Sequence, residues 1–377
     1  MTPRILFYVQ HLLGIGHLRR AAILARALAD GGFDVLMVSG GAPLALELGR
    51  ARFHQLPPVR ARDETLRALA RLDGVPIDDA FRANRARELV SLLQAEAPSI
   101  VITEQFPFGR TQLRFELLPL IEAAQAQRPR PLIVSSVRDV VRRSVSPQRV
   151  SETLEILAAF DLVLIHADPR IADFAASFAG WDRIAPRAVY TGYVAPPNES
   201  AHASEAGKDE VVVSVGGGAV GAPLLEAALA ARQGSALAGR RWRLLVGSNL
   251  SAVERTNLKP QDGIVIEPAR TDFPVLLSNA TLSISQAGYN TVVDILRFAD
   301  RALLVPFSTA RETEQSDRAR LLAARGLATV VPAETLSAES LAVAIEQALA
   351  GPSLRSFPRY DVGGAEATVE LLRARVA

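Results

Sequence analysis

The sequence predicts an α/β protein with two doubly wound domains, each built on a mostly parallel sheet. Apolar runs rich in Val, Ile and Leu alternate with amphipathic stretches along the chain, as in successive βαβ units. Two glycine-rich turns, at 14–17 and 216–221, each follow an apolar run directly. A polar, proline-bearing segment at 195–208 separates the halves. We therefore predict a first domain over 1–195 and a second over 196–377.

Length and composition are consistent with this prediction. The chain has 377 residues, 49% of them hydrophobic and 22% charged, which is enough for two cores. It contains no cysteine, which excludes disulfides, thiolate zinc sites and cysteine nucleophiles. Its formal net charge is +2 and its arginines are dispersed, which argues against nucleic-acid binding. We find no signal-peptide pattern and no run long enough to span a bilayer, so we expect a cytoplasmic protein.

The elements of the first domain begin with a strand, a glycine turn and a helix. Leu18, Ala21 and Ala25 fall on one face of that helix, and Gly31 with Gly32 ends it. The strands predicted for this domain lie at 5–9, 34–38, 53–56, 100–103, 132–135, 162–165 and 188–190.

The second domain repeats the alternation after the polar segment. A helix at 223–231 follows the second glycine turn, and an amphipathic stretch at 365–375 is predicted to pack back on the first domain. The strands predicted here lie at 211–215, 243–246, 263–266, 282–285, 302–305 and 328–331.

The second glycine turn has the spacing of a phosphate-binding loop. Gly216, Gly218 and Gly221 form a G-x-G-x-x-G pattern between a strand and a helix, where backbone amides can approach a diphosphate closely. No acid ends the following strand, and no lysine completes a P-loop. The alternative is a tight turn without a ligand.

The first glycine turn ends in His17, at the start of a helix. Ligands of open parallel sheets bind at such strand ends, and a neutral imidazole there can act as a general base. The alternatives are that His17 caps the helix or that it fills a polar niche. His11 is a weaker candidate, and we assign no role to His54, His166 or His202.

Two further junctions in the second domain have both a structural and a functional interpretation. At 285–294, Asn290 or Thr291 can cap a helix with Asp294 as a capping-box partner, or Asp294 can accept hydrogen bonds from a ribose. At 306–315, Thr309 with Glu312 can cap the next helix, or the polar side chains can bind sugar hydroxyls.

Taken in order, these motifs resemble GT-B fold glycosyltransferases, specifically the MurG-like enzymes of family 28. The resemblance covers most of the chain and implies two Rossmann-like domains facing a cleft. It places diphosphate at Gly217 and Gly218, ribose at Asp294, and the donor sugar at Glu314 and Gln315, where the family usually has Glu and Gln-Gln. The donor site implied in full is Gly216, Gly217, Gly218, Arg270, Gln286, Gly288, Asn290, Thr291, Asp294, Glu314 and Gln315.

The first domain resembles the same enzymes through its G-x-G-H-x-x-R opening. A related nucleotide-sugar hydrolase of pseudaminic acid synthesis shares this opening, so His17 is implied as the base for an acceptor hydroxyl or for water. Glu104, just past a strand, is placed to orient the imidazole. The acceptor side implied is Gly14, Gly16, Phe106, Arg110, Arg138 and Asp139.

The sequence thus predicts a metal-independent, inverting glycosyltransferase that uses a UDP-sugar as donor substrate and needs no cofactor. The acceptor is a small or lipid-linked molecule. The alternatives are a nucleotide-sugar hydrolase and a non-catalytic nucleotide-sugar-binding protein. Basic and apolar residues interleave at 138–145, either as a solvated face or as a peripheral contact with the inner face of a membrane.

Overall fold

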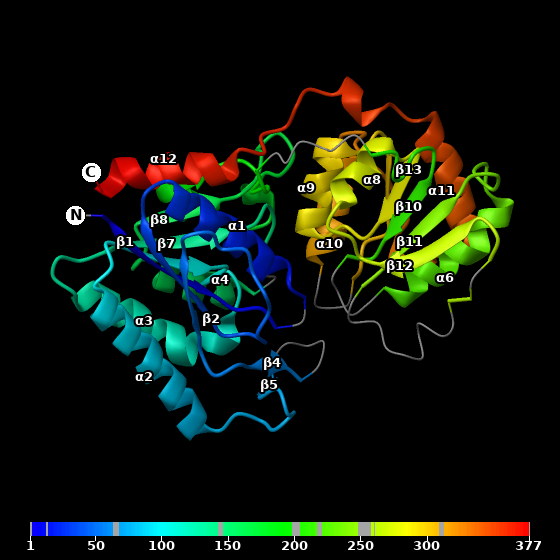
Figure 1. The fold of residues 1–377 in the computed structure, drawn as a ribbon. Helices are drawn as coiled ribbons and strands as arrows, with labels where there is room; N and C mark the ends of the chain where they lie inside the picture. The colour runs from blue at the N-terminus through cyan, green and yellow to red at the C-terminus, as the bar shows by residue number, and fades with distance from the viewer. Residues whose placement is uncertain are drawn as a thin grey trace. The chain divides into compact units, whose positions relative to one another are not determined.

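We describe the fold from a computed structural model. It describes residues 2–12, 14–62, 68–141, 146–197, 204–216, 221–247, 258–259, 261–308 and 313–376. The chain forms two compact units (Figure 1): unit 1 comprises 1–195 with 361–377, and unit 2 comprises 196–360. Of the predicted site residues, Gly217 and Gly218 lie outside the described residues, as does 142–145 of the basic and apolar segment.

Unit 1 contains a seven-stranded parallel sheet with the strand order β3-β2-β1-β6-β7-β8-β9. All seven strands were expected from their apolar runs. They are β1 (Arg4–Val9), β2 (Asp34–Ser39), β3 (Arg52–Gln55), β6 (Ile100–Glu104), β7 (Leu132–Val137), β8 (Leu162–Ile165) and β9 (Ala188–Tyr190). A separate antiparallel pair, β4 (Arg60–Ala61) with β5 (Leu69–Ala70), was not predicted, because strands of two residues show no periodicity.

The helices of unit 1 include one from the end of the chain. They are α1 (Gly16–Asp30), α2 (Asp79–Glu96), α3 (Arg114–Ala126), α4 (Pro147–Leu157), α5 (Trp181–Ile184) and α12 (Gly364–Val376), with short 3₁₀ turns η1 (Thr111–Leu113), η2 (Phe174–Ala176) and η3 (Ala185–Arg187). Helix α12 packs on α1, where Arg373 Nη2 donates to the Gly31 carbonyl over 2.6 Å. The side chain of Val369 fills the space beside Gly31.

Unit 2 contains a six-stranded parallel sheet with the strand order β12-β11-β10-β13-β14-β15. Its strands match the predicted ones: β10 (Val211–Ser214), β11 (Trp242–Val246), β12 (Ile264–Pro268), β13 (Leu282–Ser285), β14 (Ala302–Leu304) and β15 (Thr329–Val330). Its helices are α6 (Ala222–Ala231), α8 (Phe273–Asn279), α9 (Tyr289–Phe298), α10 (Glu314–Ala323) and α11 (Ala338–Ala350), with 3₁₀ turns η4 (Arg232–Gly234), η5 (Ala333–Thr335) and η6 (Leu354–Ser356).

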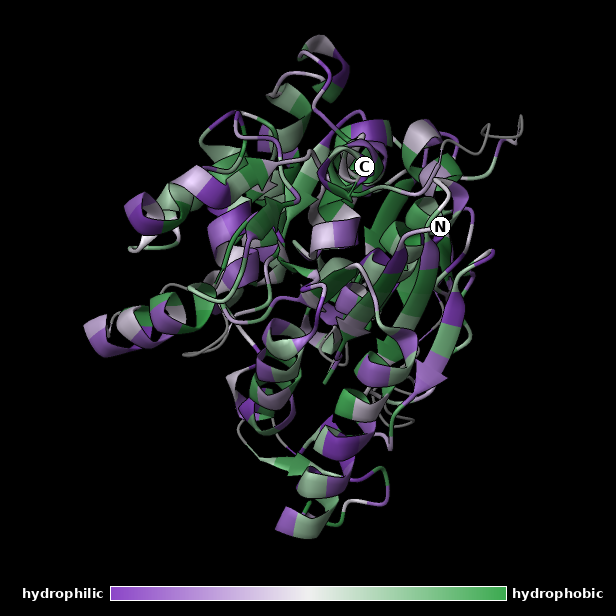
Figure 2. Cartoon of the chain, turned by 90° about the vertical axis from the view of Figure 1, so that its left-hand side faces the viewer, coloured by the Kyte–Doolittle hydropathy of each residue, from purple (hydrophilic) through white to green (hydrophobic). Residues whose placement is uncertain are grey.

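Each unit has its own hydrophobic core between sheet and helices. In unit 1 the core joins β1 residues such as Phe7 to α1 residues such as Leu24, and in unit 2 it joins Val213 to Leu225. Figure 2 shows the strands as largely hydrophobic, whereas the helices carry hydrophobic and hydrophilic residues in turn. This is the pattern of helices that cover both faces of a buried parallel sheet.

The strand orders of both sheets reverse direction next to their first strand. In unit 1 the reversal lies between β1 and β6, and in unit 2 between β10 and β13. In doubly wound sheets, ligands bind beyond the carboxyl ends of the strands at such a switch point. The loops after β1, β6, β10 and β13 are therefore the places to look for a site.

Candidate functional site

His17 and Glu104 meet at the switch point of unit 1. His17 is the second residue of α1, and its Nδ1 lies 2.9 Å from Oε1 of Glu104, the last residue of β6. The imidazole is 12% exposed and the carboxylate is fully buried. The start of α1 has no side-chain cap, so the capping interpretation of His17 is wrong.

Glu104 is held by two further polar groups. Arg20, one turn after His17 in α1, places Nη2 2.5 Å from Oε1 of Glu104, and its Nη1 donates to the Val137 carbonyl over 2.8 Å. Ser136 Oγ donates to the other carboxylate oxygen over 3.1 Å. A buried carboxylate is tolerated when it is paired and hydrogen-bonded in this way.

These contacts determine what His17 can do chemically. Because Nδ1 donates its hydrogen to Glu104, the lone pair of the neutral imidazole is on Nε2. Arg20 contacts the same carboxylate oxygen, so His17 and Arg20 share Glu104 Oε1. An oriented imidazole with its basic nitrogen fixed is suited to general-base catalysis.

Two residues predicted on the acceptor side are buried instead. The Phe106 ring is fully buried, its centroid lies 6.4 Å from that of the Phe160 ring, and the Phe106 carbonyl accepts from the Ser135 hydroxyl. Asp139 is also fully buried, and its Oδ1 accepts the Val140 amide. The prediction that these side chains line an acceptor surface is therefore wrong for this structure.

The other predicted acceptor-side residues border the same loops. Arg110 is half-buried, and its Nε donates to the Gln10 carbonyl over 2.9 Å, which joins the loop after β6 to the loop after β1. Arg138 and Gly16 are also half-buried. A Cβ added at Gly14 would meet no atom within 4 Å, so this glycine borders open space.

The segment expected to touch a membrane offers no apolar surface in its described part. Val140 and Val141 are each only 2% exposed, so they belong to the core of unit 1. Within the described ranges, no helix is sufficiently long and apolar to cross a membrane.

The switch point of unit 2 brings the second glycine turn close to the start of α9. The backbone of Gly216 has φ +64°, and the amide of Gln286 donates to the Ser214 carbonyl over 3.2 Å. A Cβ placed at Gly216 or at Gly288 would lie 3.7 Å from Thr291 Oγ1. Gly216 and the first turn of α9 thus lie side by side.

Helix α9 begins earlier than its capping pattern predicted. Gly288 is the N-cap and makes no side-chain cap, so Asn290 and Thr291 lie within the first turn, and Asp294 lies beyond it. The capping interpretation of Asp294 is therefore wrong. The amides of the first turn of a helix favour an anion.

Comparison with known proteins relates this part of the chain to glycosyltransferases. Residues 212–359 match the model of the family described as glycosyltransferase family 28 C-terminal domain. This match covers most of unit 2. The resemblance stated from the motifs is thus confirmed for this part of the chain.

A curated relative covers a smaller segment. The UDP-N-acetylglucosamine--N-acetylmuramyl-(pentapeptide) pyrophosphoryl-undecaprenol N-acetylglucosamine transferase of Chelativorans sp. (strain BNC1) is 37% identical over 87 residues. That match covers 23% of this chain and 23% of the relative, so the chain spans about a quarter of that relative's length.

Solved structures cover the whole chain at low identity. The glycosyltransferase of kitacinnamycin aligns over 100% of both chains with a TM-score of 0.66 and 15% identity. MurG of Acinetobacter baumannii aligns over 99% of both chains with a TM-score of 0.60 and 14% identity. The chain therefore has the GT-B fold that its motifs predicted.

Within the family 28 domain, α10 is tied to the turn before α9. Glu314 is the first residue of α10, and Gln315 Oε1 accepts the Phe307 amide over 3.1 Å. Arg318, only 1% exposed, donates to the Ala287 carbonyl over 2.8 Å. The sequence did not predict a role for Arg318, because an arginine in a helix shows no sign of its burial.

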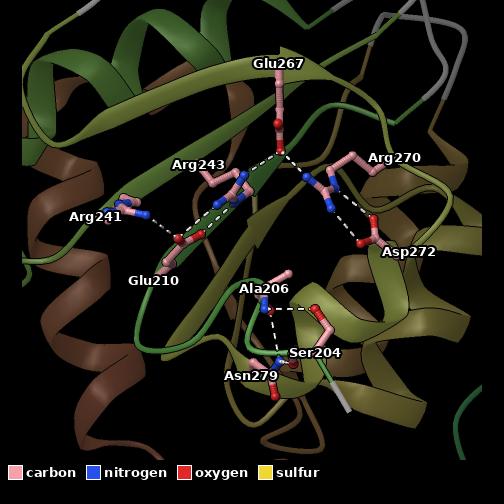
Figure 3. A network of polar contacts seen from close by, with 9 residues as sticks. All are labelled: Ser204, Ala206, Glu210, Arg241, Arg243, Glu267, Arg270, Asp272 and Asn279. Carbon is pink, nitrogen blue, oxygen red and sulfur yellow. Dashed lines mark hydrogen bonds and ion pairs between the residues drawn. The ribbon is translucent and has the colours of Figure 1, made fainter. Parts of the chain in front are cut away.

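Arg270 of the family 28 domain is not brought together with the turn residues. It follows β12, the edge strand, which β11 separates from β10. Its guanidinium pairs with Asp272 at 2.6 Å and Glu267 at 3.3 Å, within a network that includes Arg243 (Figure 3). These ion pairs raise the pKa of Arg270, chiefly through the hydrogen bonds to Asp272.

Proposed function

We propose that this protein is a metal-independent, inverting glycosyltransferase that moves a sugar from a UDP-sugar to an acceptor hydroxyl. The observation that carries the proposal is the His17–Glu104 hydrogen bond at the switch point of unit 1, in a chain whose unit 2 is a family 28 domain. A histidine oriented by a carboxylate is a common arrangement for a general base, and the family that matches unit 2 is a glycosyltransferase family.

The donor is assigned to unit 2. We propose that the turn containing Gly216 and the first turn of α9 bind the diphosphate, since both offer backbone amides at a strand end. Asp294 would accept the ribose hydroxyls, and Glu314 with Gln315 would bind the sugar. The relative named above uses UDP-N-acetylglucosamine by name, which supports a uridine nucleotide.

The chemistry is a single displacement. His17 Nε2 takes the proton of the acceptor hydroxyl as its oxygen attacks the anomeric carbon. The bond from that carbon to the diphosphate oxygen breaks, and its electron pair leaves with the diphosphate. Glu104 stabilises the imidazolium that forms, and loop amides stabilise the departing charge. Attack opposite the leaving group inverts the anomeric configuration.

The acceptor is proposed to be lipid-linked. The curated relative carries an undecaprenol-linked acceptor in its name, and such an acceptor would bring the protein to the inner face of a membrane as a peripheral protein. A panel of lipid-linked and soluble acceptors, with liposome co-sedimentation at low and high salt, separates this proposal from a small-molecule acceptor.

Substitution of His17 tests the base directly. We expect His17→Ala to lower transfer at least about 10²-fold, since a positioned general base contributes that much or more. UDP binding, measured by calorimetry, should be unchanged. His54→Ala is the matched control, because His54 pairs with Glu88 at 2.8 Å on the edge strand β3. Full turnover by His17→Ala would remove the proposed role.

Hydrolysis and simple binding are distinguished by omitting the acceptor. A transferase should release little free sugar from the UDP-sugar when no acceptor is present, whereas a hydrolase releases it rapidly. Tight binding without turnover across the acceptor panel would indicate a non-catalytic protein.

A further inference from the structure

A row of polar side chains lies along the carboxyl ends of strands β6 to β9 in unit 1, beginning at Glu104, the partner of His17. Neighbouring strands in the sheet order each contribute one group at or just past the carboxyl end. Glu104 ends β6, Ser136 lies in β7, His166 follows β8 and Thr191 follows β9. We predicted no role for His166 from the sequence, because only the strand order places it beside the other groups.

The members of this row are joined by short hydrogen bonds. Ser136 Oγ lies 3.1 Å from Glu104 Oε2 and 3.0 Å from His166 Nε2. His166 Nδ1 lies 2.7 Å from Thr191 Oγ1. Glu104, Ser136 and His166 are fully buried, and Thr191 is 3% exposed. Buried polar groups are costly unless they are paired, so this row is a built feature of the fold.

The hydrogen bonds of the row can be assigned so that each hydrogen is donated toward Glu104. A carboxylate only accepts, so Ser136 donates its hydrogen to Glu104. The Ser136 oxygen then accepts from Nε2–H of His166, and Nδ1 of His166 accepts from the Thr191 hydroxyl at 2.7 Å, a shorter contact than the 3.3 Å from that hydroxyl to the Gly192 carbonyl. This arrangement requires a neutral His166. Burial, together with the positive charge of Arg20, holds the pKa of His166 well below its usual value, as required.

We propose that Ser136 and His166 are positioning residues that set the basicity of His17, Ser136 by donating a hydrogen bond to Glu104 and His166 by hydrogen-bonding to Ser136. The proposal rests on the proposed function, in which His17 is the base. Each hydrogen bond donated to a carboxylate stabilises its negative charge and weakens its pull on a neighbouring proton. Ser136 donates directly, and His166 acts by polarising the Ser136 hydroxyl.

Three charged or titratable groups surround this system. Glu104 and Arg20 contact one another beside His17, and His166 reaches Glu104 through Ser136. Arg20 is present in all the variants considered, so the change at Ser136 is isolated. Loss of the Ser136 hydroxyl leaves Glu104 a stronger acceptor for the His17 proton, and the pKa of His17 should rise.

The test is a histidine NMR titration of the full chain labelled with ¹⁵N-histidine. The chain has five histidines, so His17 can be assigned from His17→Ala. Ser136→Ala should raise the pKa of His17 by about one unit, the size expected for one hydrogen bond to a charge. His166→Leu should raise it by a few tenths of a unit, because it only weakens the Ser136 donor.

Conservative variants and a neighbour provide the controls. Ser136→Thr and His166→Gln keep a hydroxyl and an N–H donor, and should keep the wild-type pKa of His17. Ser135→Ala removes a fully buried hydroxyl of the same strand, one that donates to the Phe106 carbonyl over 2.7 Å and not to Glu104. It should not move the His17 titration.

Kinetics give a second readout. The acid limb of the kcat/KM profile should move to higher pH by the same amount in Ser136→Ala, since that limb reports the free enzyme's base. An unmoved His17 pKa in a folded Ser136→Ala protein would overturn the proposal. If that variant does not fold, Thr191→Val and His166→Leu test the same row from its far end, and an unmoved pKa in both would likewise overturn it.

The two proposals fail in different ways. If His17→Ala keeps full turnover while Ser136→Ala still shifts the His17 titration, the base role is wrong and the hydrogen-bonded row is right. If His17→Ala abolishes transfer and Ser136→Ala leaves the titration unchanged, the row is wrong and the proposed function remains.

Discussion

The switch points of the two units share one strand order but hold opposite kinds of chemistry. In unit 1, α1 and β6 bring together His17, Arg20 and Glu104, three side chains that titrate or carry charge. In unit 2, β10 and α9 bring together glycine turns and the hydroxyl of Thr291. The same backbone topology thus provides only the place, and the side chains decide between proton transfer and anion binding.

The two sites also differ in how their groups are held. Glu104 is fully buried and bound by Arg20, Ser136 and His17, which fixes each partner in one orientation. At unit 2, helix α9 begins after Gly288, which makes no side-chain cap hydrogen bond. Substitutions at the two places should therefore separate catalysis from donor binding.

The largest effect is expected at Glu104. Glu104→Gln keeps the shape of the side chain but removes the charge that orients and stabilises a protonated His17. We expect kcat to fall on the order of 10³-fold, because the imidazole then loses its oriented tautomer. UDP affinity, measured by calorimetry, should stay within about twofold, a difference well below the 1.4 kcal/mol of a tenfold change.

Glu88→Gln is the matched control for this experiment. It breaks the His54–Glu88 pair of unit 1, at 2.8 Å on partly exposed side chains, and should leave kcat unchanged. A Glu104→Gln enzyme that keeps more than a tenth of wild-type kcat would mean that proton transfer does not depend on this pair.

The sequence predicted the sheets better than the sites. Most strands of the two large sheets are apolar runs, as expected for parallel strands buried on both faces, whereas the edge strand β3 is partly exposed and mixed in polarity. The His17–Glu104 pairing followed from two strand ends that adjoin one switch point. Ser136 and His166 were missed because their contact depends on which strands are neighbours. The start of α9 was misplaced because Gly288, with no side chain to cap, precedes better capping residues.

A smaller effect, on stability, should distinguish the units in acid. The pKa of His11, in unit 1, is lowered to about 4, first by burial and then by Arg110. Between pH 6.5 and pH 4 the unfolded chain binds a proton at His11 and the folded chain does not. The free energy of unfolding therefore falls as the pH is lowered through this range. The loss is about 1.4 kcal/mol per pH unit and about 3 kcal/mol by pH 4.

The chain provides its own probes for this prediction. One tryptophan, Trp181, lies in unit 1, and the other, Trp242, lies in unit 2, whose described residues include no histidine. Trp242→Phe and Trp181→Phe proteins therefore report each unit separately in urea titrations at pH 7 and pH 5. The unit 1 midpoint should fall more on acidification, and His11→Gln should reduce that fall. Equal losses in the two units would contradict the prediction.

The smallest effect is expected at Gly216, on the donor side. Its φ of +64° disfavours a side chain, and an added Cβ would lie 3.7 Å from Thr291 Oγ1, in the space assigned to the diphosphate. Gly216→Ala should weaken UDP binding about tenfold, since displacing the turn costs about 1–2 kcal/mol. The acid limb of kcat/KM should not move, because His17 and Glu104 belong to the other unit.

Gly32→Ala imposes similar backbone strain at φ +93° with no atom within 4 Å, so it controls for strain alone and should bind UDP normally. Equal UDP affinity in both variants would show that the turn after β10 does not hold the donor, and the contrast between the two switch points would then rest on unit 1 alone.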